Sequence, residues 1–189
     1  MKTEKYTSQV QSLIREYAYR YSEEPFRLAS GLLSNHYFNC KEITLHPLRL
    51  SVLTKAIVWE LIPRSGLSIP EAIGGLTLGA DPISYSVALE YLDQGQIVFP
   101  LVVRKQPKDH GTGKRIEGLV DSVKSCMVVD DVITTGSSTL MAVEVLREAG
   151  IQVTEGICIL DREEGGREIL EQNQVRIHSL FKKSDFLEG

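Results

Sequence analysis

The chain contains 189 residues, of which 42% are hydrophobic and 24% charged, with a net charge of −4 and a pI near 5.6. These values are typical of one globular domain, and the acidic balance disfavours a general nucleic-acid binder. Neither an apolar signal core nor a membrane-length apolar run is present, so we expect a cytoplasmic protein with no membrane partner. An odd number of widely spaced cysteines also favours a reducing compartment: Cys40, Cys126 and Cys158.

The amino-terminal part of the chain is predicted to differ from the rest. Residues 26–46 are expected to be irregular or strand-like, and Pro25 is expected to end a helix before them. We expect residues 1–45 to form a small hood element over a core of residues 46–189, within a single domain of residues 1–189. The helix before Pro25 is amphipathic and carries its apolar residues on one face: Val10, Leu13, Ile14, Tyr17, Ala18 and Tyr21.

The middle of the chain predicts two helices and two strands. A helix is expected over 47–63, because proline stands at both ends of an apolar pattern. A short strand is expected at 72–73, and a second helix over 82–93. The apolar run 97–103 predicts a strand that lies off-centre or is kinked, because Pro100 cannot donate a backbone hydrogen bond.

The remaining part of the chain alternates regularly between strands and helices. Strands are predicted over 125–131, 151–160 and 175–181, with helices over 138–149 and 163–172 between them. This alternation is typical of an α/β protein with a mostly parallel sheet flanked by helices on both faces.

Residues 126–138 carry the strongest indication of a binding site. An apolar strand ends in Asp130 and Asp131, and a turn rich in small and hydroxyl residues leads into a helix. In such sheets, ligands bind beyond the carboxyl ends of the strands. Amides and hydroxyls at a helix start suit a phosphate, whereas paired carboxylates suit the hydroxyls of a sugar. The segment therefore predicts a site for a phosphorylated ribose, and the alternative is a strand that ends in two solvated aspartates.

A second feature is a cationic segment at residues 104–118. It contains five Lys or Arg residues, and its proline and glycines disfavour a helix or strand. A positively charged loop of this length predicts a lid over an anionic ligand. The alternative is an ordinary solvated basic loop.

These two segments resemble one known family. Residues 126–138 resemble the signature of type I phosphoribosyltransferases, which bind 5-phosphoribosyl 1-pyrophosphate (PRPP). The sequence Arg-Lys-x-x-Lys-Asp-His-Gly at 104–111 resembles the catalytic loop of orotate phosphoribosyltransferases. The resemblance implies the type I phosphoribosyltransferase fold with a small N-terminal hood, and Mg²⁺ as cofactor. It also implies a homodimer in which the loop of one subunit covers the active site of the other.

The implied activity is transfer of phosphoribose from PRPP to N1 of orotate, which gives orotidine 5′-monophosphate and pyrophosphate in UMP biosynthesis. A phosphoribosyltransferase for another base and a non-catalytic PRPP-sensing regulator are the alternatives. Neither is favoured. The first would lack the lid sequence, and the second would bring a DNA-binding extension or a basic surface.

The resemblance also implies roles for particular residues. In the lid, the catalytic residues would be Lys108, Asp109 and His110. PRPP would be bound by Arg104, Lys105, Lys108, His110, Asp130, Asp131, Val132, Ile133, Thr134, Thr135, Gly136, Ser137 and Ser138. Orotate would be bound by Thr134, Tyr37, Phe38 and Arg162, with the arginine on its carboxylate. The metal would be held mainly by PRPP and water. The chain departs from many members at Ala29, where they carry a lysine that reaches PRPP.

Overall fold

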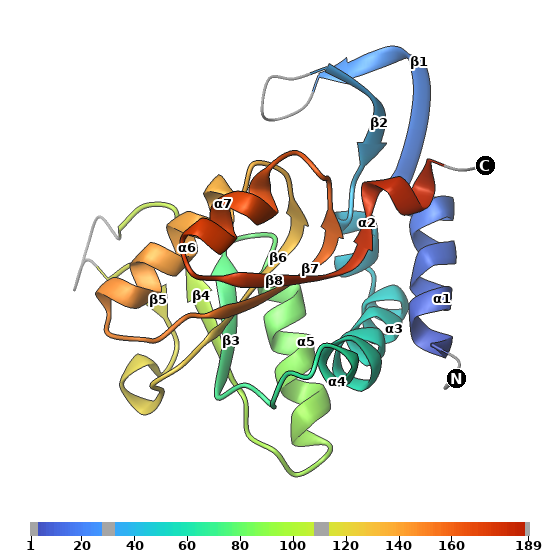
Figure 1. The fold of residues 1–189 in the computed structure, drawn as a ribbon. Helices are drawn as coiled ribbons and strands as arrows, with labels where there is room; N and C mark the ends of the chain where they lie inside the picture. Colours follow the sequence, from blue (N-terminus) through green and yellow to red (C-terminus); the bar gives the residue numbers. More distant parts are fainter. Residues whose placement is uncertain (1–3, 28–32, 108–113, 188–189) are drawn as a thin grey trace.

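The computed structural model describes residues 4–27, 33–107 and 114–187. Within these ranges, a six-stranded sheet has the order β5-β4-β3-β6-β7-β8 (Figure 1). The neighbouring pairs are parallel except for β5, which is antiparallel to β4. The strands are β3 (Ala72–Leu76), β4 (Phe99–Val103), β5 (Ile116–Glu117), β6 (Met127–Ile133), β7 (Glu155–Asp161) and β8 (Arg176–Lys182). The prediction of an α/β fold with a mostly parallel sheet is confirmed.

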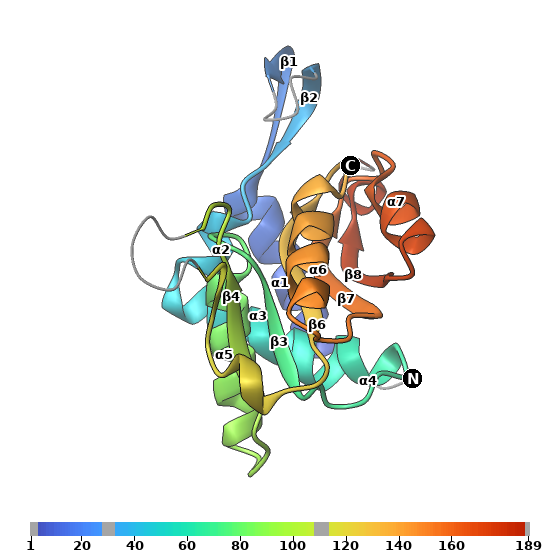
Figure 2. The same ribbon diagram turned by 90° about the vertical axis from the view of Figure 1, so that its left-hand side faces the viewer.

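Helices cover both faces of this sheet (Figures 1 and 2). One face packs against α1 (Lys5–Leu13), α3 (Pro47–Ala56) and α5 (Asp81–Leu92), and the other against α6 (Ser137–Glu148) and α7 (Gly166–Gln172). Successive residues of β6 alternate between the two cores: Val129 lies in the first and Val128 in the second. Burial on both faces explains why this strand is an unbroken apolar run in the sequence.

The amino-terminal segment begins with a helix and then forms a hairpin. Helix α1 continues into the π-helical turn η1 (Ile14–Ala18), and β1 (Tyr19–Arg27) pairs antiparallel with β2 (Leu33–Phe38). The hairpin extends away from the main sheet, whereas α1 packs against α3 (Figure 1). The division into a hood and a core at residue 45 stays a prediction.

The predicted first helix was too long. The chain becomes a strand at Tyr19, and the side chain of Tyr21, which was assigned to the buried helix face, is 61% exposed. Pro25 lies inside β1, at an interruption where the pairing register shifts between Tyr21 and Phe26. An unpaired stretch tolerates a residue without a backbone N–H, so this proline did not end the element as predicted.

Other boundaries differ by a few residues. The predicted helix over 47–63 consists of α3, the π-helical turn η2 (Ile57–Leu61) and α4 (Ile62–Arg64). The short helix α2 (Lys41–Thr44) was not predicted. The lid segment was expected to contain no strand, but its last part forms β5, because Ile116 is buried and pairs with Val103. Short 3₁₀ helices complete the fold: η3 (Val120–Ser122) and η4 (Lys183–Phe186).

Two further findings concern the chain as a whole. Among the helices of the described ranges, none is long and apolar enough to cross a membrane. The three cysteines are buried free thiols. Burial raises the pKa of Cys126 to about 12, so this thiol stays protonated and behaves as a small core residue.

Candidate functional site

Asp130 and Asp131 lie near the carboxyl end of β6, and each is 7% exposed. Oδ1 of Asp130 accepts a hydrogen bond from the backbone N–H of Asp131, and Oδ2 accepts one from the hydroxyl of Thr139, both at 2.9 Å. Oδ1 of Asp131 accepts from the backbone N–H of Val132 at 2.9 Å. These bonds fix both carboxylates in place, and the alternative of two solvated aspartates is excluded.

The fourth oxygen of the pair has a partner that the sequence did not reveal. Oδ2 of Asp131 accepts a hydrogen bond from Nζ of Lys41 at 3.1 Å, and the two side chains form an ion pair. Lys41 is the first residue of α2, which follows the hairpin directly. The contact joins residues 90 positions apart in the sequence.

The environment shifts the pKa values of these groups. Burial, together with the charge of Asp131, raises the pKa of Asp130 to about 7, although the hydrogen bond from Thr139 acts in the opposite direction. Burial acts to lower the pKa of Lys41, but the charge and hydrogen bond of Asp131, together with the charge of Asp130, outweigh burial and raise the pKa. The lysine is therefore cationic at neutral pH, and Asp130 titrates in that region.

The loop after β3 packs directly on the acidic pair. A Cβ atom at Gly79 would lie 2.6 Å from Oδ1 of Asp131 and 2.8 Å from Oδ1 of Asp130, so only glycine allows this approach. The hydroxyl of Thr77 donates to Asp81 across 2.6 Å at the start of α5. This loop therefore adjoins the predicted ribose site.

The hydroxyl-rich turn forms the start of α6. Gly136 has a φ of 76°, which favours glycine, and α6 begins at the next residue. The turn surrounds a small cavity of about 30 Å³, lined by Asp130, Val132, Ile133, Thr134, Thr135, Gly136, Ser137, Ser138 and Thr139. Backbone N–H groups at the start of a helix attract anions, so this turn suits a phosphate group.

The turn is supported from behind by the start of α7. A Cβ atom at Gly166 would lie 2.4 Å from the carbonyl oxygen of Thr134 and 2.7 Å from the amide nitrogen of Gly136. No side chain fits between these two backbones. The close contact therefore holds the turn in position.

Arg162 follows β7 and is buried, with 4% of its surface exposed. Its Nη2 lies 3.0 Å from Oε1 of Glu164 and 3.5 Å from the carbonyl oxygen of His36 in β2. Its Nε and the Oε2 of Glu164 are buried and have no hydrogen-bond partner among the described residues. Arg162 is therefore not a surface residue, and its guanidinium retains a donor for a second carboxylate.

The two aromatic candidates of β2 differ in exposure. Phe38 is 6% exposed and packs against Tyr19, with ring centroids 4.9 Å apart, so it belongs to the core. Tyr37 is 39% exposed and lies beside Phe26, with ring centroids 5.4 Å apart. Of the two, Tyr37 has a ring surface free for a ligand. Contact of either with orotate stays a prediction.

The ends of the lid segment are joined. The backbone N–H of Arg104 donates to the carbonyl oxygen of Arg115 at 2.8 Å, and the Arg115 guanidinium donates to the carbonyl oxygens of Arg104 and Lys105 at 3.4 and 3.2 Å. The Arg104 side chain lies 3.6 Å from Glu117. Since β4 and β6 are both parallel to β3, the lid begins at the same sheet edge as the acidic pair. The predicted catalytic residues lie outside the described ranges: Lys108, Asp109 and His110.

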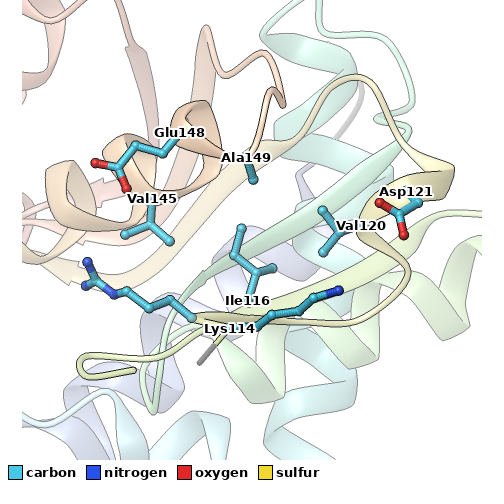
Figure 3. Close-up of a pocket in the computed structure, with 8 residues that line it drawn as sticks. Lys114, Ile116, Val120, Asp121, Val145, Glu148 and Ala149 are labelled. Atoms are coloured by element: carbon cyan, nitrogen blue, oxygen red, sulfur yellow. The ribbon is translucent and has the colours of Figure 1, made fainter. Parts of the chain in front are cut away.

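A larger hollow of about 400 Å³ lies elsewhere (Figure 3). Ile116, Val120 and Val145 face it, and Glu148 lies at its edge. The end of α6 forms one wall of this hollow, whereas the acidic pair lies beside the start of the same helix. Because α6 has 12 residues, its two ends are roughly 18 Å apart. The hollow has a mainly apolar floor and is separate from the candidate site.

Comparison with known proteins identifies the family. The orotate phosphoribosyltransferase of Leptospira biflexa is 62% identical over 173 residues, which is 92% of this chain and 93% of that protein. The enzyme of the same name from Aquifex aeolicus is 44% identical over 176 residues, which is 93% of this chain and 94% of that protein. The chain belongs to the orotate phosphoribosyltransferase family. The resemblance found in the sequence is thereby confirmed.

The fold of a family member agrees with this assignment. The crystal structure of the Mycobacterium tuberculosis orotate phosphoribosyltransferase, in complex with Fe(III) dicitrate, matches with a TM-score of 0.78 at 27% identity. The match covers 95% of this chain and 98% of that one. No family model matches the sequence. The type I phosphoribosyltransferase fold implied by the resemblance is confirmed.

Proposed function

We propose that this protein transfers the phosphoribosyl group of PRPP to N1 of orotate, as a pentosyltransferase of pyrimidine biosynthesis. The observation that carries the proposal is the fixed pair Asp130 and Asp131 beside a hydroxyl-rich turn, in a chain of the orotate phosphoribosyltransferase family. The bond between C1′ and the pyrophosphate oxygen breaks, and the bond between N1 and C1′ forms. The products are orotidine 5′-monophosphate and pyrophosphate.

The acidic pair acts on the ribose. Its carboxylates accept hydrogen bonds from the 2′- and 3′-hydroxyls, and their negative charge stabilises the positive charge that develops on the sugar. Because their oxygens are already fixed by the protein, little reorganisation is needed when that charge appears. Asp130 must be ionised in this role, so activity should fall on the acidic side of its pKa.

The turn 134–138 takes the 5′-phosphate. The residues of this turn line the small cavity at the start of α6, where the helix dipole favours an anion. Gly136 adopts the left-handed conformation that this turn needs.

The lid takes the pyrophosphate. Arg104, Lys105, Lys108 and His110 supply cationic contacts, and Asp109 lies in the segment that closes over the reacting centre. Mg²⁺ supplies further positive charge to the leaving group when it is bound. The described residues contain no cluster of three metal-binding side chains, and the four oxygens of the acidic pair already accept hydrogen bonds. This donor set suits a metal ion held mainly by PRPP and water.

Orotate lies beside the hairpin in this proposal. Its carboxylate binds the guanidinium of Arg162, Thr134 contacts the ring, and Tyr37 packs against it, next to Phe38. The unpaired Nε of Arg162 is the structural feature that supports a carboxylate ligand.

We further propose a homodimer in the cytoplasm. One face of α5 exposes apolar side chains that repeat at helical spacing: Tyr85, Leu89 and Leu92, which are 53, 63 and 57% exposed. Such a stripe suits a second copy of the chain, which would bring its lid to the neighbouring site. Three buried free thiols support a reducing compartment.

A base-selection assay tests the function. The protein is mixed with Mg²⁺, PRPP and one of orotate, uracil, adenine or hypoxanthine, and consumption of the base is followed. Only orotate should be consumed. Consumption of another base would favour the first alternative, and PRPP binding without turnover would favour a regulator. In the active protein, Lys108→Ala should lower kcat by roughly 10²–10³, with the exposed Lys124→Ala as control.

A further inference from the structure

We propose that Lys41 is a PRPP-binding residue, whose ammonium holds Asp131 in the free protein and contacts an anionic oxygen of bound PRPP. The inference rests on the proposed function, because it assumes that the acidic pair binds the ribose. It adds a residue from the amino-terminal segment to a site otherwise built from β6, α6 and the lid.

The position of Lys41 is fixed by its neighbours. It follows Cys40, which is 1% exposed, and it shares the single turn of α2 with Ile43, which is fully buried. The backbone at this point is therefore anchored in the core. From there the side chain reaches Oδ2 of Asp131, across 3.1 Å.

The ammonium retains the capacity to bind a second group. A lysine has three N–H donors, and one of them is directed at Asp131. Within the described ranges, no other hydrogen bond of this ammonium occurs. The Lys41 side chain is 46% exposed, compared with 10% for that of Asp131. A ligand on the acidic pair can therefore reach the lysine from the solvent side.

The charge of the site also calls for this cation. PRPP carries several negative charges, and two adjacent carboxylates repel such a ligand at short range. The ammonium of Lys41 pairs with Asp131 and neutralises one of the two carboxylate charges. Each carboxylate oxygen of the pair accepts one hydrogen bond within the protein and can accept a second from a ribose hydroxyl.

Lys41 also bears on position 29, where this chain differs from the sequence pattern of the family. The resemblance implies a PRPP-binding lysine at this position, where this chain has alanine, which lies outside the described ranges. Lys41 belongs to the same amino-terminal segment and brings an ammonium to the ribose site. We assign to it the positive charge that Ala29 does not supply.

The test removes the positive charge of Lys41 and keeps a side chain of similar length. Lys41→Met should raise the KM for PRPP at least tenfold and weaken PRPP binding, measured by calorimetry with Mg²⁺ and without orotate, by a similar factor. The KM for orotate should change less than twofold. Lys41→Arg should restore most of the PRPP affinity. Lys124→Met is the matched control, because it removes one exposed lysine at the opposite end of β6.

Two results would overturn the assignment. In the first, Lys41→Met binds PRPP as the wild type does. In the second, both KM values rise together, the melting temperature falls and arginine does not rescue, which indicates a structural role alone. Failure of the proposed function is distinguishable, since the wild type would then consume no orotate while calorimetry still measures PRPP.

Discussion

The hydroxyl of Thr139, in the first turn of α6, donates a hydrogen bond to Asp130 of β6 across 2.9 Å. Both residues are buried. The bond stabilises the ionised carboxylate, whereas burial and the neighbouring Asp131 favour the protonated form. The raised pKa of about 7 is the balance of these effects. The start of α6, where we propose that the phosphate binds, therefore also controls the charge of the carboxylate proposed to bind the ribose.

Thr139→Val removes this bond and should raise the pKa of Asp130 further. Since the proposed role needs the ionised carboxylate, the acid limb of kcat/KM for PRPP should move to higher pH. A lost hydrogen bond to a charged group costs about 1.5–3 kcal/mol, so activity at pH 6.5 should fall tenfold or more. The loss should shrink above pH 8. The measurement is a pH profile of kcat/KM.

Thr54→Val is the matched control. Thr54 is also buried, but its hydroxyl donates to the carbonyl oxygen of Leu50 within α3, away from the acidic pair. Its pH profile should match that of the wild type. An unchanged acid limb in Thr139→Val would show that this hydrogen bond does not set the ionisation of Asp130.

Removal of the Arg162 guanidinium should affect orotate and spare PRPP. A single substitution would leave the partly buried Glu164 as an unpaired charge, which destabilises the fold. The double variant Arg162→Met with Glu164→Gln avoids this problem. It should raise the KM for orotate by roughly 10- to 100-fold, the range for one lost charged contact. Equal changes in both KM values, obtained from initial rates, would argue against the assignment.

The close contact behind the turn 134–138 gives a steric prediction. In Gly166→Ala the new methyl group would collide with the backbone of Thr134 and Gly136. The turn must shift, so kcat/KM for PRPP should fall at least about tenfold.

Gly165→Ala is the neighbouring control. Gly165 has a φ of 86°, but a Cβ atom there meets nothing within 4 Å. This variant should lose only about 1 kcal/mol of stability from backbone strain and keep its activity within threefold. If both variants lost PRPP affinity equally in steady-state assays, strain in α7 would be the cause rather than the collision.

Glu60 provides a prediction about stability and pH. Its carboxylate accepts hydrogen bonds from the backbone N–H groups of Tyr6 and Thr7, in the first turn of α1. Burial acts to raise the pKa of Glu60. The hydrogen bonds from Tyr6 and Thr7 together outweigh burial, so the pKa is lowered. A lowered pKa means that the stabilisation is present above the ordinary value near 4.5 and is lost as the pH falls through the folded value.

Glu60→Gln should therefore destabilise the protein at pH 7 by about 1 kcal/mol, the usual effect of losing a helix cap. The difference from the wild type should vanish in strongly acidic solution. Urea unfolding at a series of pH values measures it. Glu144→Gln, an exposed residue of α6, should show no such dependence. A destabilisation that stays constant with pH would mean that the charge is not responsible.

Much of the sheet and of the acidic site was predictable from local patterns. Strand β6, with residues buried on both faces, is a continuous apolar run, and its prediction over 125–131 was shifted by two residues from 127–133. Helix α6 was predicted one residue late, because the hydroxyl residues before it are also good helix starts. The acidic pair followed from its place between these two elements.

The features that were missed depend on contacts distant in sequence. Strand β1 contains Pro25, and only its pairing with β2 shows that the proline occupies an interruption. Lys41 becomes part of the site through one ion pair with Asp131, and nothing in its neighbourhood predicts that contact. Burial of Arg162 also depends on the approach of β2 and could not be derived from its own strand.

The clamp that Arg115 forms with Arg104 and Lys105 separates the cationic segment from the rest of the protein. Because both ends of the segment are joined at the edge of the sheet, a change in its length alters the free energy of folding only slightly. The segment between these two anchor points can thus be replaced with little effect on the stability of the fold. We therefore expect that segments from other enzymes of the family can be exchanged here without redesign of the β-sheet, so that turnover can be engineered separately from stability.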